Sequence, residues 1–253
     1  MVSRHFFDLV FYKAFAELRT ENSRAMGGYL WWVMEPLMTL GVYFAVFSFL
    51  RQGGTGDFVI FLFIGIVFWR WFQASVMRSA SSLILNRELM LQVDLHKMIP
   101  PLSVVIIDTV KFSITFLLLI VMVFSFGGGA NLAWFSLPVL LITQIFLITG
   151  CACFVAAVTP VFPDFAHILS TLMMLMMFCS GVFYPISIVP ERVQWVLLLN
   201  PMTVLIMQYR DVFLEAKGID ALRLLGVWLE VVVIFALGAY LLHKYNKVYP
   251  KIC

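Results

Sequence analysis

Ionisable side chains lie within long apolar stretches of the sequence, where a charge is costly unless it is neutralised or used. Among them are Arg70, Asp108, Lys111 and Glu230. Asp108 and Lys111 are three residues apart, on one face of a helix, so they form either a mutually neutralising pair or a proton relay. Arg70 can raise its guanidinium to a membrane interface while its stem stays in lipid, or it can meet an anionic headgroup.

The rest of the sequence carries no pattern for catalysis. It contains no G-x-x-x-x-G-K-[ST] phosphate loop, no metal-ligand spacing and no converging Ser/His/Asp set. The four cysteines follow no redox or metal pattern and are interpreted as small apolar fillers. We therefore expect no enzymatic activity and no cofactor in this chain. A net charge of +3 is too small to predict nucleic-acid binding.

The composition indicates a membrane protein, because 62% of the 253 residues are hydrophobic and 12% are charged. Soluble domains carry about 25% charged residues, and a helical crossing needs about 20 mostly apolar ones. Six stretches meet this need: 30–50, 58–76, 102–126, 132–158, 165–184 and 222–242. We expect an all-α membrane protein with one domain over residues 1–253, a six-span bundle at 30–242 and a cytoplasmic tail at 243–253.

Residues 1–29 predict an amphipathic helix that lies in the membrane surface. Its apolar positions recur at spacings of three and four. They are Phe6, Phe7, Val10, Phe11, Ala14, Phe15 and Leu18. The alternative is an ordinary amphipathic helix packed on a soluble partner. Placing both termini in the cytoplasm puts about twice as many basic residues inside as outside, which favours this orientation.

The loop between the fifth and sixth predicted spans contains two apolar segments, 188–199 and 202–214, with Asn200-Pro201 between them. Each is too short to cross a bilayer, and this length is typical of re-entrant or interfacial helices. Non-helical backbone at membrane depth is tolerated only inside protein or beside a water-filled cavity. A re-entrant pair would therefore imply a polar pathway, whereas the alternative is a loop on the outer surface.

The run Gly28-Tyr29-Leu30-Trp31, followed by Glu35-Pro36, resembles the start of the ABC-2 type transport permeases, most closely those that export capsular polysaccharide. Phe183-Tyr184-Pro185, Asn200-Pro201 and Tyr209-Arg210-Asp211 also resemble landmarks of this family, in which the region forms an extracytoplasmic gate. With Arg70, these motifs give the candidate channel and gate residues. They are Tyr29, Trp31, Arg70, Phe183, Tyr184, Asn200, Pro201, Tyr209 and Arg210.

In the resembled family, the connection at residues 81–97 holds a coupling helix that receives the motion of an ATPase subunit. The candidate coupling residues are Asn86, Arg87, Glu88, Leu89 and Asp94, with Pro163 and Asp164 in a second cytoplasmic turn. The alternative is a solvated loop helix. Many O-antigen exporters have Arg-Asp where this chain has Pro163-Asp164, and this difference favours the capsule branch.

The resemblance implies a homodimer joined to two copies of a nucleotide-binding subunit, which would supply ATP and Mg²⁺. The complex would export a lipid-linked anionic polysaccharide across a bacterial inner membrane, with periplasmic and outer-membrane export proteins as further partners. The alternatives are an O-antigen or teichoic-acid permease, a small-molecule ABC-2 exporter, or a proton-coupled permease. The last would need Asp108 or Glu230 to titrate during transport.

Overall fold

The computed structural model describes residues 2–24, 30–50, 56–93, 95–125, 129–162, 164–245 and 249, and every element in these ranges is a helix. The α-helices are α1 (Val2–Arg24), α2 (Leu30–Leu50), α3 (Gly56–Ala80), α4 (Ser82–Leu85), α5 (Arg87–Gln92), α6 (Ile99–Ser125), α7 (Leu137–Val158), α8 (Phe165–Cys179), α9 (Glu191–Leu198), α10 (Pro201–Leu214) and α11 (Ala221–Lys244). Two short 3₁₀ helices, η1 (Leu132–Ser136) and η2 (Ile186–Ile188), precede α7 and α9.

Four helices of the described part are long and apolar enough to cross a bilayer. They are Phe58–Ala80 within α3, α6, the continuous η1–α7 segment Leu132–Val158, and α11. These four confirm the all-helical class and four of the predicted spans. The remaining two predicted spans correspond to α2, with 21 residues, and α8, with 15. The count of six spans therefore stays a prediction.

Helix α8 ends at Cys179, five residues before the predicted end of the fifth span. Gly181 has a φ of +66°, a backbone conformation that L side chains rarely adopt, and it turns the chain away from the helix axis. At 1.5 Å per residue, α8 is about 22 Å long, shorter than the apolar core of a bilayer. The chain after it must therefore complete this side of the bundle.

Helix α3 forms the centre of the bundle and packs against α2, α6, α7, α8 and α10. Most of its side chains are apolar and buried, whereas Arg70, Ala74 and Arg78 remain partly or fully exposed on the side of α2 and α6. Beside it, α7 and α11 approach closely through two glycines. A Cβ added to Gly150 would lie 3.1 Å from the Phe235 nitrogen, and one on Gly238 would lie 2.8 Å from the Phe154 nitrogen. Small residues permit this backbone approach in membrane bundles.

Helix α1 packs across one end of the bundle, against α6, and the structure divides its predicted apolar stripe between two faces. Val10, Ala14 and Leu18 are buried. Phe7, Phe11 and Phe15 are exposed. Only part of the stripe therefore contacts protein, and the placement of α1 in a membrane surface stays a prediction.

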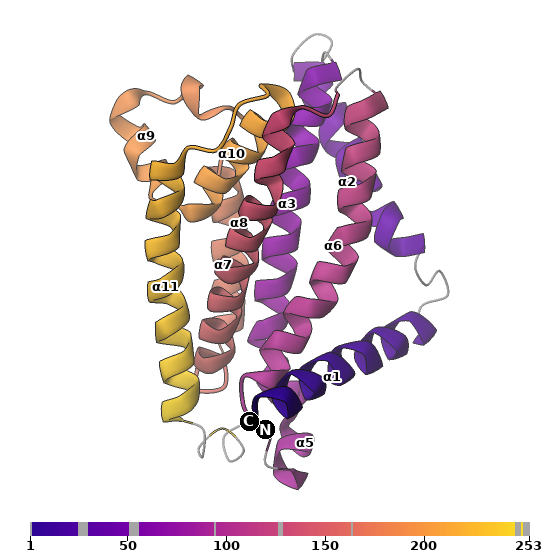
Figure 1. Ribbon diagram of the computed structural model, residues 1–253, viewed down its shortest axis with the longest axis vertical. Coiled ribbons are helices and arrows are strands. Elements are labelled where there is room, and N and C mark those ends of the chain that lie inside the picture. Colours follow the sequence, from indigo (N-terminus) through magenta and orange to yellow (C-terminus); the bar gives the residue numbers. More distant parts are fainter. Residues whose placement is uncertain are drawn as a thin grey trace.

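The bundle has two distinct ends (Figure 1). Both termini, α1 and α5 lie at one end, whereas α9 and α10 lie at the other. The two predicted short segments are indeed helical, although α9 begins at Glu191 and residues 186–188 form η2. Asn200 caps α10, because its side-chain oxygen accepts a hydrogen bond from the Met202 nitrogen at 3.0 Å. Pro201 occupies the first turn, where no amide donor is needed.

Candidate functional site

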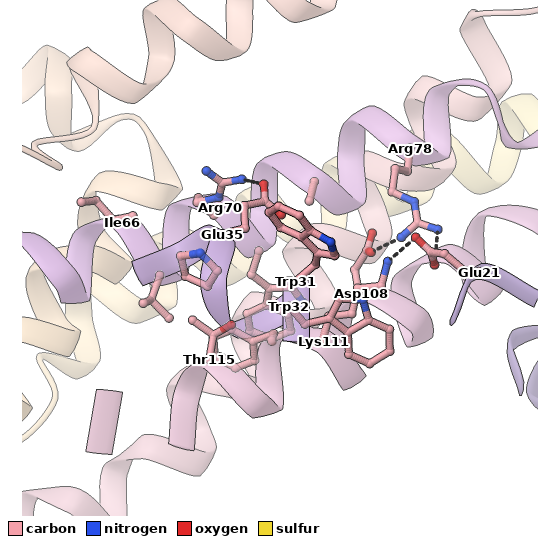
Figure 2. Close-up of a pocket in the computed structure, with 15 residues that line it drawn as sticks. Glu21, Trp31, Trp32, Glu35, Ile66, Arg70, Arg78, Asp108, Lys111 and Thr115 are labelled. Carbon is pink, nitrogen blue, oxygen red and sulfur yellow. Dashed lines mark hydrogen bonds and ion pairs between the residues drawn. The ribbon is translucent and has the colours of Figure 1, made fainter. Parts of the chain in front are cut away.

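A cleft of about 470 Å³ opens between α1, α2, α3 and α6 (Figure 2). We call it the charged cleft. Its ionisable side chains are Glu21, Glu35, Arg70, Arg78, Asp108 and Lys111, and its aromatic side chains are Trp31, Trp32, Trp71 and Phe112. The volume falls within the range of about 300–1,000 Å³ that is typical of ligand sites.

Four of these charges form a connected network at one end of the cleft (Figure 2). The Lys111 Nζ lies 2.7 Å from Glu21 Oε1, and the Arg78 Nη2 lies 3.6 Å from Glu21 Oε2. Arg78 also donates to Asp108 Oδ1 at 2.5 Å. Asp108 and Lys111 therefore have separate ion partners on α3 and α1, and they do not form the direct pair considered from the sequence. Each side chain reaches across to a neighbouring helix, and sequence spacing carries no information about such contacts.

Arg70 pairs with α2 instead of lying free at an interface. Its Nη2 forms an ion pair with Glu35, and its Nη1 donates to Thr39 Oγ1 at 3.0 Å. The side chain of Arg70 is 40% exposed and that of Glu35 is 61% exposed, so the pair is accessible from the cleft. This contact joins α2 to α3 in the region of Pro36, which lines the same cleft.

The aromatic side chains flank the charges. Trp31 is exposed, whereas Trp71 is buried and stacks on Phe112 with ring centroids 3.9 Å apart. The Lys111 ammonium lies 5.4 Å from the Trp32 ring centroid, within cation–π range. Trp31, a candidate channel residue, thus lines the charged cleft. Tyr29, another candidate channel residue, lies outside the described residues.

Helix α5, which carries three of the predicted coupling residues, lies at the end of the bundle with the termini (Figure 1). Arg87, Glu88 and Leu89 are exposed on α5, and Asp164 is exposed before α8. Asp94 and Pro163 lie outside the described residues.

Asn86 accepts a hydrogen bond from the Lys13 Nζ at 2.7 Å, so α1 contacts this connection directly. The Phe6 ring also lies edge-on to His96, with centroids 5.4 Å apart. Sequence reasoning missed the contact between Lys13 and Asn86, because residues 73 positions apart give no periodic signal.

Arg210 and the carbonyl oxygens of Phe61, Gly181 and Val182 form a cluster that we call the outer clamp, because the predicted orientation puts this end of the bundle outside the cytoplasm. The Arg210 Nη1 and Nη2 donate to the Gly181 and Val182 carbonyl oxygens at 2.7 Å each. Its Nε and Nη2 donate to the Phe61 carbonyl at 3.2 Å, and its Cζ lies 3.4 Å from the Phe61 ring centroid. The side chain is buried and ties α10 to α3 and to the turn after α8.

The other candidate gate residues surround this clamp. Tyr209 is fully buried and stacks on Phe68 with ring centroids 3.5 Å apart. Phe183 is buried, and Tyr184 is half-buried with its hydroxyl donating to the Phe178 carbonyl at 2.9 Å. Asn200 also donates to Ser180 Oγ at 2.7 Å, so the α10 cap is fixed to the end of α8. Within this chain these side chains hold together the end of the bundle that carries α10, and their role in a gate stays a prediction.

The charged cleft and the outer clamp lie in a chain with clear relatives. The family model for the ABC-2 type transporter matches residues 16–214. The O-antigen export system permease protein RfbA of Klebsiella pneumoniae is 27% identical over 233 residues, which cover 90% of each chain. A protein of the same name from Myxococcus xanthus is 28% identical over 213 residues, covering 83% of this chain and 82% of the relative.

The polysialic acid transport protein KpsM of Escherichia coli is 23% identical over 235 residues, covering 88% of this chain and 89% of the relative. The matches to these relatives extend over nearly the full length of both chains, and the family model alone includes the C-terminal part of α1, the charged cleft, the coupling connection and the outer clamp. The resemblance seen in the sequence motifs is thereby confirmed, and the chain belongs to the ABC-2 type transporter family.

Proposed function

We propose that this chain is the membrane-spanning subunit of an ATP-binding cassette exporter that moves lipid-linked anionic polysaccharide across a bacterial inner membrane. The observation that carries the proposal is the near full-length match to permease proteins named for O-antigen export and polysialic acid transport. Two copies of the chain would line the path, and two copies of a separate ATPase subunit would supply ATP and Mg²⁺. This chain would perform no chemistry on ATP.

The two ends of the bundle suit this division of work. At the end with the termini, exposed Arg87, Glu88 and Leu89 offer a short helix of both charge signs to a partner. At the other end lie α9 and α10, and Arg210 fastens α10 to the turn after α8. In the proposed orientation, both termini and α5 lie in the cytoplasm, and α9 and α10 form an outer cap over the conduit.

Two polysaccharide classes remain in competition, and each has an observation in its favour. The Pro163-Asp164 pair favours capsular polysaccharide, because many O-antigen exporters have Arg-Asp at this place. The higher identities to O-antigen permeases, 27% and 28% against 23% for the polysialic acid protein, favour O-antigen. If the polymer is a capsular polysaccharide, periplasmic and outer-membrane export proteins are expected partners.

The proposed coupling is tested by adding the cognate ATPase subunit to the full-length chain in lipid nanodiscs. We expect no ATP hydrolysis from the chain alone and hydrolysis after the complex forms. The double variant Arg87→Ala/Glu88→Ala should lose assembly or coupled hydrolysis. Its matched control is Glu191→Ala/Arg192→Ala, an exposed pair of the same charges at the other end, which should assemble normally.

Export is tested in cells that lack the chromosomal copy of this chain and carry the wild-type or variant gene. Surface polysaccharide should return with the wild type and fail to return with Arg87→Ala/Glu88→Ala. Labelling with reagents specific for capsule or O-antigen separates the two classes. Normal export of the polymer by cells that lack the chain would overturn the proposal, and restoration of small-molecule resistance alone would favour a drug exporter.

A further inference from the structure

The network in the charged cleft contains a carboxylate held by two cations that come from other helices. Glu21 belongs to α1, whereas Arg78 belongs to α3 and Lys111 to α6. Lys111 contacts Glu21 at 2.7 Å, and Arg78 contacts it at a looser 3.6 Å. The Glu21 side chain is 43% exposed, so it lies at the mouth of the cleft and can leave without disrupting the core. Two cations around one accessible anion form a site suited to an exchangeable anion.

Asp108 has a different position in this network. Its side chain is only 4% exposed, and Arg78 donates to its Oδ1. Asp108 therefore fixes one edge of the Arg78 guanidinium and leaves the Nη2 edge directed toward Glu21. The other carboxylate oxygen, Oδ2, is buried and has no hydrogen-bond partner among the described residues. Arg78 is thus pre-oriented, which lowers the entropy lost when its free edge binds an anion.

Beyond this network, apolar side chains line much of the cleft, which here also holds the ion pair that joins α2 to α3. Ile66, Val67 and Phe112 line this part, and all three are buried in the bundle. Ile66 lies 12 residues before Arg78 on α3, about 18 Å along the helix axis. A site with cations at one end and a largely apolar wall beyond them, in which the second ion pair is mutually neutralised, matches an amphipathic ligand. A free anion or a bare sugar would leave the apolar wall without a partner.

We propose that the charged cleft binds a lipid with a phosphate-ester headgroup, and that Glu21 occupies the phosphate position when the lipid is absent. Arginine presents several N–H donors in a planar fork that fits phosphate, and lysine adds a compact positive charge. Trp31 and Trp32 lie beside these cations, and tryptophan commonly lies at the level of lipid headgroups. The acyl chain extends along the apolar wall, and Glu21 turns toward solvent when the phosphate enters.

This proposal differs sharply from a purely structural role of Glu21. If Glu21 only fastens α1 to the bundle, its removal loosens the cleft and weakens any lipid bound there. If Glu21 competes with a phosphate for Arg78 and Lys111, its removal strengthens lipid binding. The two roles thus predict opposite signs for one variant.

The test measures binding of phosphatidylglycerol to the full-length chain in detergent by native mass spectrometry, with diacylglycerol as a probe that lacks the phosphate. Wild type should retain phosphatidylglycerol much more strongly than diacylglycerol. Glu21→Gln should raise the affinity about three- to ten-fold, since it removes the partly exposed carboxylate that competes with the phosphate for Arg78 and Lys111. Lys111→Gln should lower it about ten-fold or more, since a charge-assisted contact to the phosphate is lost. Lys111→Arg should restore most of the binding.

Two matched controls lie on the same helix. Glu17 pairs with Lys13 outside the cleft, and Arg19 is exposed. Glu17→Gln and Arg19→Gln remove one charge of each sign from α1, and both should bind phosphatidylglycerol like the wild type. Equal retention of diacylglycerol and phosphatidylglycerol would overturn the proposal. Weaker binding by Glu21→Gln, with correct folding shown by an unchanged melting curve, would overturn it as well.

The phosphate lipid has two possible sources, the surrounding bilayer and the anchor of an exported polymer, and only the second rests on the proposed function. Native mass spectra of the complete transporter from cells with and without polysaccharide synthesis distinguish them. A phosphate lipid bound in both preparations comes from the bilayer, and one bound only with synthesis is the anchor. Absence from both would contradict the site itself. Normal export of the polymer by cells that lack the chain would contradict the proposed function and leave the binding result intact.

Discussion

Replacing Gly65 with alanine should break the outer clamp, although no charged residue is substituted. Gly65 lies on α3, and the Arg210 guanidinium packs against its bare Cα. A Cβ at this position would lie 2.7 Å from Arg210 Nη2, 2.8 Å from the Val182 carbonyl oxygen and 3.2 Å from the Val182 Cα. Two of these neighbours are backbone atoms, so the methyl group displaces both the turn after α8 and the guanidinium.

The cost follows from three contributions. Overpacking a filled interior costs about 1–3 kcal/mol. Loss of one of the hydrogen bonds from the charged guanidinium to Val182 costs about 1.5–3 kcal/mol. Alanine within a helix returns about 0.5–1 kcal/mol relative to glycine. The expected net loss of stability is therefore about 2–5 kcal/mol, and even the lower value corresponds to about a thirty-fold change in the folded-to-unfolded ratio.

The assay is thermal unfolding of the purified chain in detergent, followed with a maleimide dye that fluoresces on reaction with newly exposed thiols. Cys153 is fully buried and reports the opening of α7. Because such unfolding is commonly irreversible, all variants are compared at one heating rate. Gly226→Ala is the matched control, since a Cβ there has nothing within 4 Å. A Gly65→Ala protein as stable as Gly226→Ala would refute the clamp geometry.

Three further outcomes are expected. Gly238→Ala should lower the same unfolding temperature by forcing α11 away from the Phe154 backbone of α7, and this reasoning fails if it unfolds like Gly226→Ala. Asn200→Ala should cost about 1 kcal/mol through loss of the α10 cap, with more dye or ion leakage from cells, whereas the exposed Gln92→Ala should do neither. Single cysteines at positions 86 and 217, in a chain without other cysteines, should be labelled from the cytoplasm and from the periplasm respectively; the reverse pattern would invalidate the proposed orientation.

Hydropathy located the long helices well, because burial in lipid or in the bundle centre demands the same continuous apolar run. The predicted stretch 58–76 became α3, and 102–126 became α6 with a start at Ile99. Pro100 and Pro101 lie in the first turn of α6. The first amides of a helix have no intrahelical acceptor, so proline is accepted there and does not end the helix.

The side-chain partners could not be read from the sequence. Asp108 and Lys111 satisfy the spacing rule for a pair on one helix, yet Arg78 and Glu21 are their partners. Spacing rules describe neighbours on a single helix, whereas these contacts depend on how α1, α3 and α6 pack. Residue type and membrane depth therefore pointed to Arg70, Asp108 and Lys111, while their partners and the cleft that they share required the three-dimensional structure.

Arg210 explains how the bundle tolerates the early end of α8. The chain after Cys179 turns at Gly181 without forming another turn of helix, so the carbonyl groups of this turn have no intrahelical donor. In an apolar environment each unsatisfied carbonyl would cost several kcal/mol. The guanidinium supplies donors to the Gly181 and Val182 carbonyls at once, and its other donors bind Phe61.

A lysine could not replace this arrangement, because one ammonium cannot span three carbonyls from two segments while also stacking on the Phe61 ring. The arrangement also requires glycine at position 65, because any Cβ there would occupy the space of the Arg210 Nη2. The break in α8, the glycine on α3 and the arginine on α10 are therefore mutually dependent. The hydrogen bonds of the clamp join α10 both to α3 and to the turn after α8.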